Sequence, residues 1–171
     1  KANLKGTVLS GANLTGARLR SANLRGTVFS GAKMTGAYLP GSDLTGTVLA
    51  GTNLTSANLS GSNFKGTDLS STKLTGANLS SAKLMGADLG GAKLAGANLD
   101  GASLRWATLA EASLAGASLR EADATGADFS AANLLGSDLT GAQLKLAKFV
   151  GSAMSGVDLS GAKLDKANLT L

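Results

Sequence analysis

The chain has 171 residues, among them 24 glycines, one proline, no cysteine and no histidine, and its formal net charge is +5. The absence of histidine and cysteine excludes or strongly disfavours Cys/His zinc sites, haem and iron–sulfur centres, disulfide frameworks and histidine-activated nucleophiles. The single proline and the 43% of hydrophobic residues indicate one packed domain rather than a disordered or collagen-like chain. No apolar run approaches the ~18 residues of a membrane span, so we expect no membrane partner.

From end to end the chain divides into five-residue repeats without an insertion, beginning KANLK, GTVLS and GANLT. Every fifth residue from Leu4 to Leu169, here called the central position, is Leu, Phe or Met, except for Ala124. The small position, two residues before the centre, is Ala, Ser or Thr except at Val157. The corner position, two residues after the centre, holds 23 of the 24 glycines. The outward and trailing positions, directly before and after the centre, vary.

A period of five suits neither a helix nor one long strand. Successive central residues would rotate by about 140° on a helix and would alternate between the two faces of a strand. A coil that turns a corner once per repeat resolves the conflict, because each side is then a very short strand. Its central and small residues point inward, and its outward residue points to solvent.

A weaker second period, four times as long as the first, indicates the number of sides. It is visible in two series of residues: Thr7, Thr27, Thr47 and Thr67, and Val8, Val28 and Val48. The sequence therefore predicts four sides per coil, with the members of such a series stacked in parallel ladders about 4.8 Å apart. About eight and a half coils would form a rod roughly 41 Å long.

The repeat positions also carry local expectations. Glycine suits a corner because it adopts positive φ without steric cost. We expect positive φ not to be obligatory at every corner, because other residues occupy the same column: Ser21, Ser56, Trp106, Glu111 and Glu121. Asn or Asp at the outward position should bond neighbouring backbone groups. Ala124 is too small to fill its layer and should create a local defect or bend.

These residues resemble the pentapeptide-repeat proteins, whose motif A(D/N)LXX occurs here as ANLTG (12–16), ANLRG (22–26), SDLTG (42–46), ADLGG (87–91) and ANLLG (132–136). The resemblance covers essentially the whole chain. It implies an all-β fold, the right-handed quadrilateral β-helix, which agrees with the coil inferred from the two periods. We expect a single uninterrupted solenoid domain over residues 1–171.

The resemblance also implies one candidate function. The quinolone-resistance and gyrase-protecting members look like DNA: they are acidic rods that dimerise through the C-terminal end and occupy the DNA site of gyrase. This chain departs from them, because its net charge is +5 and no loop interrupts its repeats. It also ends in a repeat, ANLTL (167–171), without a capping helix. A DNA-mimic gyrase or topoisomerase modulator is therefore the alternative function and not the favoured one.

Function is expected at outward-facing residues, because the inward ones are committed to packing. Residues 1–42 carry six bases and no acid, whereas residues 86–171 carry nine acids and seven bases. Five basic residues share the trailing position of one side and form a basic stripe: Lys5, Arg25, Lys65, Arg105 and Lys145. The stripe would suit nucleic-acid phosphates or an acidic partner. The modest total charge and the lack of interleaved aromatic residues favour a third interpretation, in which it only keeps the rod soluble.

Trp106 and Leu146 replace the usual corner glycine on one side of the coil, two coils apart, with Met85 nearby. A large aromatic side chain at an exposed corner is a candidate hot spot for protein binding. The alternative interpretation is a surface tryptophan that only covers adjacent small residues.

Stacked acids, Asp68 with Asp88 and Asp138 with Asp158, would suit a shared cation, but we interpret them as ordinary members of their column. The threonine series Thr15 to Thr75 is likewise interpreted as solvated surface. No insertion interrupts the convex rod to form a pocket around the acids and bases. We therefore expect no enzyme, no metal site and no cofactor.

The sequence thus predicts a rigid, non-catalytic scaffold that presents Trp106, Leu146 and the basic stripe to a protein partner. Binding of nucleic acid or another acidic partner through the stripe is a further alternative. Terminal coils that expose leucine and unpaired backbone groups predict either an end-to-end homodimer or a longer chain.

Overall fold

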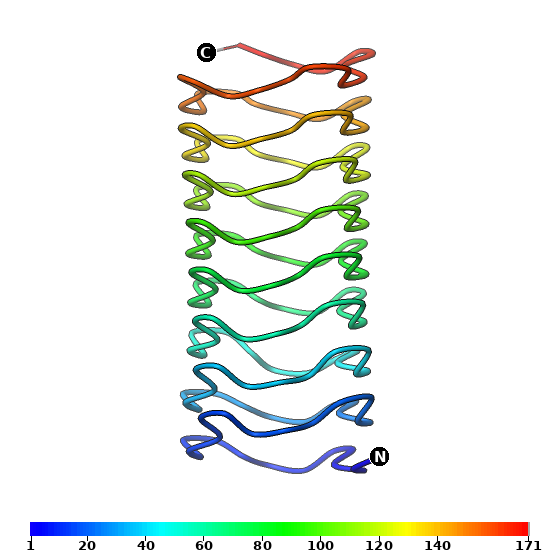
Figure 1. Ribbon diagram of the computed structural model, residues 1–171, viewed down its shortest axis with the longest axis vertical. Coiled ribbons are helices and arrows are strands. Elements are labelled where there is room, and N and C mark those ends of the chain that lie inside the picture. Colours follow the sequence, from blue (N-terminus) through cyan, green and yellow to red (C-terminus); the bar gives the residue numbers. More distant parts are fainter. Residues whose placement is uncertain (171) are drawn as a thin grey trace.

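The computed structural model describes residues 1–170, and Leu171, the last residue of the predicted domain 1–171, lies outside them. The chain winds into a stack of coils, with its two ends at opposite ends of the rod (Figure 1). Each outward residue forms a parallel bridge to its counterpart one coil further along, from Asn3 with Asn23 to Lys148 with Asn168. Within residues 1–170 each side contributes one bridged residue rather than a longer strand, and no helix is present. The two sequence periods therefore predicted the sides and the coil correctly.

Three backbone hydrogen bonds per repeat join one coil to another. The N–H of Asn23 donates to the carbonyl of Ala2 in the preceding coil at 3.0 Å, and its carbonyl accepts from the N–H of Leu4 at 2.9 Å. The N–H of the corner residue Gly6 donates to Arg25 at 2.9 Å. Central and corner N–H groups thus point toward the following coil, whereas outward N–H groups point toward the preceding one.

One further backbone bond closes each corner, and at many corners a side chain adds a second. The N–H of Thr7 donates to the carbonyl of Leu4 at 3.1 Å, which tightens the turn between consecutive sides. Where the outward residue is Asn or Asp, its side chain accepts from the N–H of the trailing residue two positions later, as when Thr15 donates to Oδ1 of Asn13 at 3.2 Å. Every Asn and Asp at an outward position makes this bond. The predicted role of these residues is confirmed.

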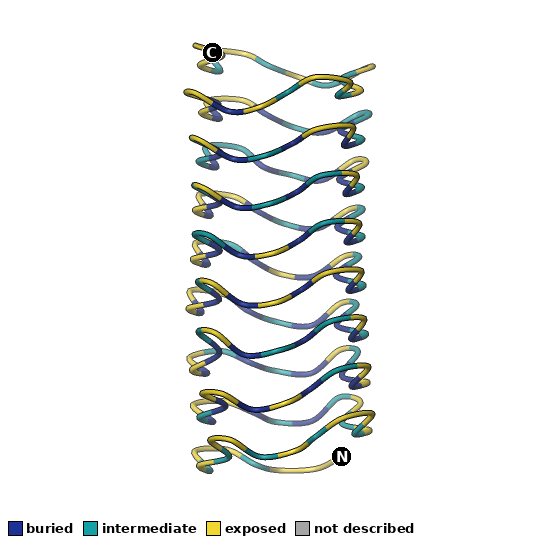
Figure 2. Cartoon of the chain, turned by 90° about the vertical axis from the view of Figure 1, so that its left-hand side faces the viewer, coloured by how far each residue is buried: buried dark blue, intermediate teal, exposed yellow. Residues whose placement is uncertain are grey.

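The interior is an apolar column built from the central and small positions (Figure 2). Central residues are fully buried from Leu24 to Phe149. Where the small residue carries a hydroxyl, that hydroxyl commonly bonds a carbonyl of the preceding coil, as in Thr27 to Leu4 at 2.7 Å and Ser62 to Leu39 at 2.7 Å. These bonds satisfy the hydroxyls without disturbing the core, and within residues 1–170 the exception is Ser137, whose hydroxyl has no partner.

Ala124 does not interrupt the ladders. Its N–H donates to the carbonyl of Gln143 at 2.8 Å, and the residue itself is buried. The next side of the same coil supplies a larger residue, Phe129, whose ring stacks on that of Phe149 with centroids 5.0 Å apart. The predicted local defect is absent from the hydrogen bonding, which continues through this layer without a break.

The corners correct one prediction. All corner residues from Gly6 to Lys166 have positive φ, between 61° and 70° at the glycines and between 52° and 62° at ten other residues. The expectation that non-glycine corners escape this conformation was wrong. At a corner the chain turns from one side of the coil to the next while the corner N–H stays hydrogen-bonded to the following coil. The turn therefore requires positive φ whichever residue is present. Most corner glycines have open space where a Cβ would lie, which explains why other side chains fit.

Candidate interaction surface

The predicted site residues all lie along one corner of the coil. We number the sides in chain order, so side 1 carries the ladder that begins with Asn3 and Asn23, and corner 1 comprises the outward residues of this side together with the trailing and corner residues that follow them. Consecutive coils are bonded along this corner, as when the N–H of Trp106 donates to Thr125 at 3.0 Å and that of Gly126 to Lys145 at 2.8 Å. Corner 1 includes all the residues of the predicted surface: Lys5, Arg25, Lys65, Arg105, Trp106, Lys145 and Leu146.

Trp106 is the largest exposed apolar side chain of this corner, and 58% of its surface is accessible. Its indole lies along the rod over the next corner residue, since a Cβ added at Gly126 would overlap the ring atoms Cδ2, Cε3 and Cζ3. Only glycine leaves room for this placement. The ring thus covers a neighbouring small residue, as one interpretation of the sequence has it, and still exposes more than half of its surface.

Two other apolar side chains accompany Trp106. Leu146, two coils further on, has φ of 62° and is 39% exposed. Met85, one coil before Trp106, is half-buried at the trailing position. The corner therefore carries a large apolar side chain in three of four consecutive coils.

Ion pairs neutralise part of the basic stripe. Arg25 pairs with Asp43 at 3.3 Å, and Arg105 pairs with Asp123 at 3.8 Å. In each pair the base is a trailing residue, and the acid is the outward residue of the same side one coil later. We call this contact the cross-coil relation. Sequence reasoning missed these pairs, although the matching offset between base and acid was the signal for them.

The same cross-coil relation on side 4 joins Arg120 with Asp138 at 3.0 Å. A polar version joins Nδ2 of Asn63 to Oγ1 of Thr45 at 3.0 Å. The relation is thus a general contact of this coil and not a peculiarity of one pair.

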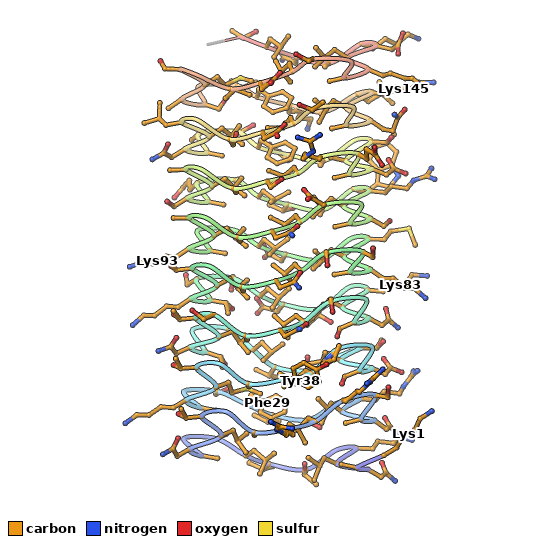
Figure 3. All side chains as sticks on the ribbon, viewed as in Figure 1. Lys1, Phe29, Tyr38, Lys83, Lys93 and Lys145 are labelled. Atoms are coloured by element: carbon orange, nitrogen blue, oxygen red, sulfur yellow. The ribbon has the colours of Figure 1, made fainter. Side chains whose placement is uncertain are left out.

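On corner 1 the cross-coil relation also brings together residues of like charge. Lys65 stands in this relation to Lys83, and Lys145 stands in it to Lys163. All four side chains are exposed, and none makes an ion pair with another residue of the described chain, 1–170. Figure 3 shows Lys83 and Lys145 extending from one edge of the rod, whereas Lys93 extends from the opposite edge.

The carboxylates that pair with Arg25 and Arg120 are held in their ionised form. Partial burial raises the pKa of Asp43, but the hydroxyl and amide of Thr45, at 2.6 and 3.1 Å, together with Arg25, outweigh burial and lower it below its usual value. For Asp138 the hydroxyl and amide of Thr140 lower the pKa most, and Arg120 adds to the effect. Both acids therefore remain charged well below neutral pH.

A hollow of about 660 Å³ lies in the first two coils, where the convex rod was expected to have no pocket. Its lining includes Arg18, Arg20 and Tyr38 and contains no carboxylate that would act with them as an acid and base pair. Residues 1–170 contain no cluster of three or more His, Cys, Asp or Glu that would suit a metal ion, and the stacked Asp138 is instead engaged by Arg120. No helix long and apolar enough to cross a membrane occurs in the same range.

The stacked coils, the parallel ladders and the continuous apolar column define a solenoid repeat protein. The chain belongs to the pentapeptide-repeat family: the model described as pentapeptide repeats matches in 8 copies, over residues 2–41, 28–66, 52–91, 62–101, 87–123 and 137–171. Its fold is the right-handed quadrilateral β-helix that the motif predicted. Proteins of this family are generally non-catalytic structural repeat proteins.

Three solved structures illustrate the relationship. HetL, a pentapeptide-repeat protein involved in heterocyst differentiation regulation in the cyanobacterium Nostoc sp. strain PCC 7120, is 29% identical, with 97% of this chain and 88% of HetL covered and a TM-score of 0.36. QnrB1, a plasmid-mediated fluoroquinolone resistance protein, is 22% identical, with 96% and 89% covered and a TM-score of 0.49. Rfr23 from the cyanobacterium Cyanothece 51142 is 27% identical, with 94% and 88% covered and a TM-score of 0.28. No curated protein sequence matches the chain significantly.

Proposed function

We propose that this protein is a rigid, non-catalytic scaffold that presents corner 1 to another protein. The observation that carries the proposal is Trp106, which remains 58% exposed at a corner that is hydrogen-bonded to both neighbouring coils. Exposed tryptophan on a rigid frame binds at little entropic cost and is enriched in binding hot spots. Basic side chains around it supply the polar rim that such surfaces usually have.

The experiment places a photo-crosslinking phenylalanine derivative at Trp106 and, in a matched variant, at Val48. Val48 is also exposed and apolar, at 41%, but it lies in the side 2 ladder and not on corner 1. In extracts of the source cells we expect discrete protein adducts from position 106 only. Equal adducts from both positions, or adducts that disappear after nuclease treatment, would contradict the proposal.

A role as DNA mimic at gyrase or a topoisomerase is the alternative suggested by the family. The charge argues against it, because a mimic of DNA needs an acidic surface and this chain has a net charge of +5. We expect no effect of the protein on gyrase supercoiling, with or without a quinolone. Protection of gyrase at stoichiometric protein would establish the alternative instead.

Nucleic-acid binding through the basic stripe is the further alternative. It is weakened by the ion pairs, since two of the five stripe residues, Arg25 and Arg105, already face Asp43 and Asp123. Retention of a DNA or RNA oligonucleotide at low salt, with a steep loss as salt rises, is the result that would favour it.

A further inference from the structure

Two lysine pairs are the only places on corner 1, within residues 1–170, where the cross-coil relation brings two bases together. Lys65 with Lys83 and Lys145 with Lys163 occupy the geometry in which Arg25 makes an ion pair. The cross-coil relation joins opposite charges in the ion pairs, but it joins two positive charges in these lysine pairs. An anionic group from outside would complete each pair as the aspartate does elsewhere.

The spacing of the two pairs limits what can reach both. They are four coils apart, which is about 19 Å along the rod at about 4.8 Å per coil. An extended peptide advances about 3.3 Å per residue, so about six residues span this interval. The same spacing between coils applies over the whole interval, because the coils stack in an unbroken ladder.

The surface between the pairs carries two apolar side chains and no net charge. Met85 and Trp106 lie on corner 1 within the interval, and the one charged pair there, Arg105 with Asp123, neutralises itself. Leu146 stands beside the second lysine pair, and Asp165 is the trailing residue of the repeat that contains Lys163. A partner that fits must therefore carry negative charge at two places with an apolar centre between them.

We propose that corner 1, from Lys65 to Lys163, binds an extended peptide segment with acidic residues about six positions apart and apolar residues between them. The acidic ends meet the lysine pairs, and the apolar centre lies on Met85 and Trp106. This inference rests on the proposed function and deepens it, because it names the chemistry of the protein partner.

A nucleic acid fits the same surface less well. A strand of DNA carries a phosphate every ~3.4 Å, and a protein that follows it needs a continuous basic track. Between Lys65 and Lys163, corner 1 instead has pairs of basic groups at two places, a neutral centre and one aromatic side chain, whereas single-strand binding uses a series of stacking rings.

The test uses the whole chain and two synthetic peptides of identical composition. The first has two glutamates at each end and a run of four apolar amino acids between them. The second has all four glutamates together at one end. Because Trp106 is the only tryptophan, its emission reports directly on corner 1. We expect the first peptide to bind saturably with a blue shift of that emission, and the second to bind at least about fivefold more weakly, which is the effect of losing one surface ion pair at the upper end of its usual range.

Matched variants separate position from total charge. K65Q/K83Q and K145Q/K163Q each remove one lysine pair from corner 1. Each should weaken the binding of the first peptide by about fivefold or more. K73Q/K93Q removes the same charge from side 3, where Lys73 and Lys93 are exposed and bridged to one another, and should leave binding unchanged.

Three results would overturn the proposal: equal binding of the two peptides, equal loss in all three variants, or an oligothymidylate that binds as tightly as the first peptide with the same dependence on the corner lysines. If the peptides fail but the photo-crosslinking residue at position 106 still captures a protein in the extract, only the peptide chemistry is wrong. If that residue captures nothing while the first peptide binds specifically, the proposed cellular role fails and the peptide site stands.

Discussion

Ten corner residues other than glycine hold a left-handed backbone conformation that usually costs an L-residue about 1–2 kcal/mol. They tolerate it because the coil bonds on both sides of the corner leave the backbone no other course. The cost falls on single residues and is independent of what their side chains touch, since most corners face open space.

Exchange of residues at two open corners measures this cost. Ala131 has φ of 56° and Gly136 has φ of 62° with nothing within 4 Å of an added Cβ. Ala131→Gly should raise the free energy of unfolding by about 0.5–1 kcal/mol, after allowance for the greater freedom of unfolded glycine, and Gly136→Ala should lower it similarly. Urea unfolding followed by circular dichroism checks both. Two changes of the same sign would contradict this account of the corners.

The small position offers a second comparison between single residues. Ser137 is buried and its hydroxyl has no hydrogen-bond partner among residues 1–170, whereas the equally buried hydroxyl of Ser62 donates to Leu39 at 2.7 Å. Ser137→Ala should leave stability unchanged or raise it by up to about 1 kcal/mol, and Ser62→Ala should lower it by about 1 kcal/mol. Urea midpoints decide the comparison, and a larger loss for Ser137→Ala would show that its hydroxyl is bonded in solution.

At the scale of a side and its corner, the important unit is the column that runs from coil to coil. Columns were predictable from the sequence because the longer period places residues in register. The contacts that a side chain makes were less predictable, because it can lean along the rod onto the next coil or across to the neighbouring column. The indole of Trp106 over Gly126 and the cross-coil ion pairs are contacts of this kind.

The Trp106 column yields a prediction with an internal control. At Gly126 a Cβ would overlap the indole, whereas at Gly116, with nearly the same φ, it would meet nothing within 4 Å. Both alanine variants incur the cost of positive φ. Because only the Cβ at position 126 overlaps the indole, Gly126→Ala should be less stable than Gly116→Ala and should alone displace the ring. A change in tryptophan emission for Gly126→Ala only is the expected result. Identical spectra for both variants would mean that the indole does not lie on Gly126 in solution.

Much of the architecture followed from repeat spacing, because five-residue repeats leave one way to gather every central residue. The conformation of the non-glycine corners could not be predicted from the spacing. Ser or Glu in the glycine column suggested that positive φ is not required there, but the coil imposes positive φ on these residues too. The site was predictable as a set of positions and not as an electrostatic surface. The neutralisation of Arg25 and Arg105 depends on a contact between neighbouring columns.

At the scale of the whole molecule, the acid dependence of stability should come from carboxylates, chiefly from the aspartates whose pKa folding lowers, because the chain has no histidine or cysteine. Asp43, Asp128, Asp138 and Asp158 all have a pKa lowered by folding. A lowered pKa stabilises the fold at pH above the unfolded value, about 3.9, and this stabilisation is lost as the pH falls through the folded value. The free energy of unfolding should thus be nearly constant from about pH 5 to 7 and should fall below about pH 4.

Urea unfolding over a series of pH values tests this, with Asp138→Asn as the matched variant. Asparagine keeps the acceptor oxygen for Thr140 but does not titrate, so the acid limb of the curve should become shallower. A marked change of stability between about pH 5 and 7 would contradict the assignment of the pH dependence to aspartate.

The directions of the coil-to-coil hydrogen bonds have an electrical consequence. In each repeat two N–H groups point toward the following coil and one toward the preceding coil, so the peptide dipoles do not cancel along the rod. About one peptide dipole, about 3.5 D, remains per repeat, with its negative end toward the first coil. The side chains are arranged the other way, with six bases and no acid in residues 1–42 and an excess of acids in residues 86–171. The uneven charge of the chain thus complements the polarisation of its own backbone, as oppositely charged side chains do at the two ends of an α-helix.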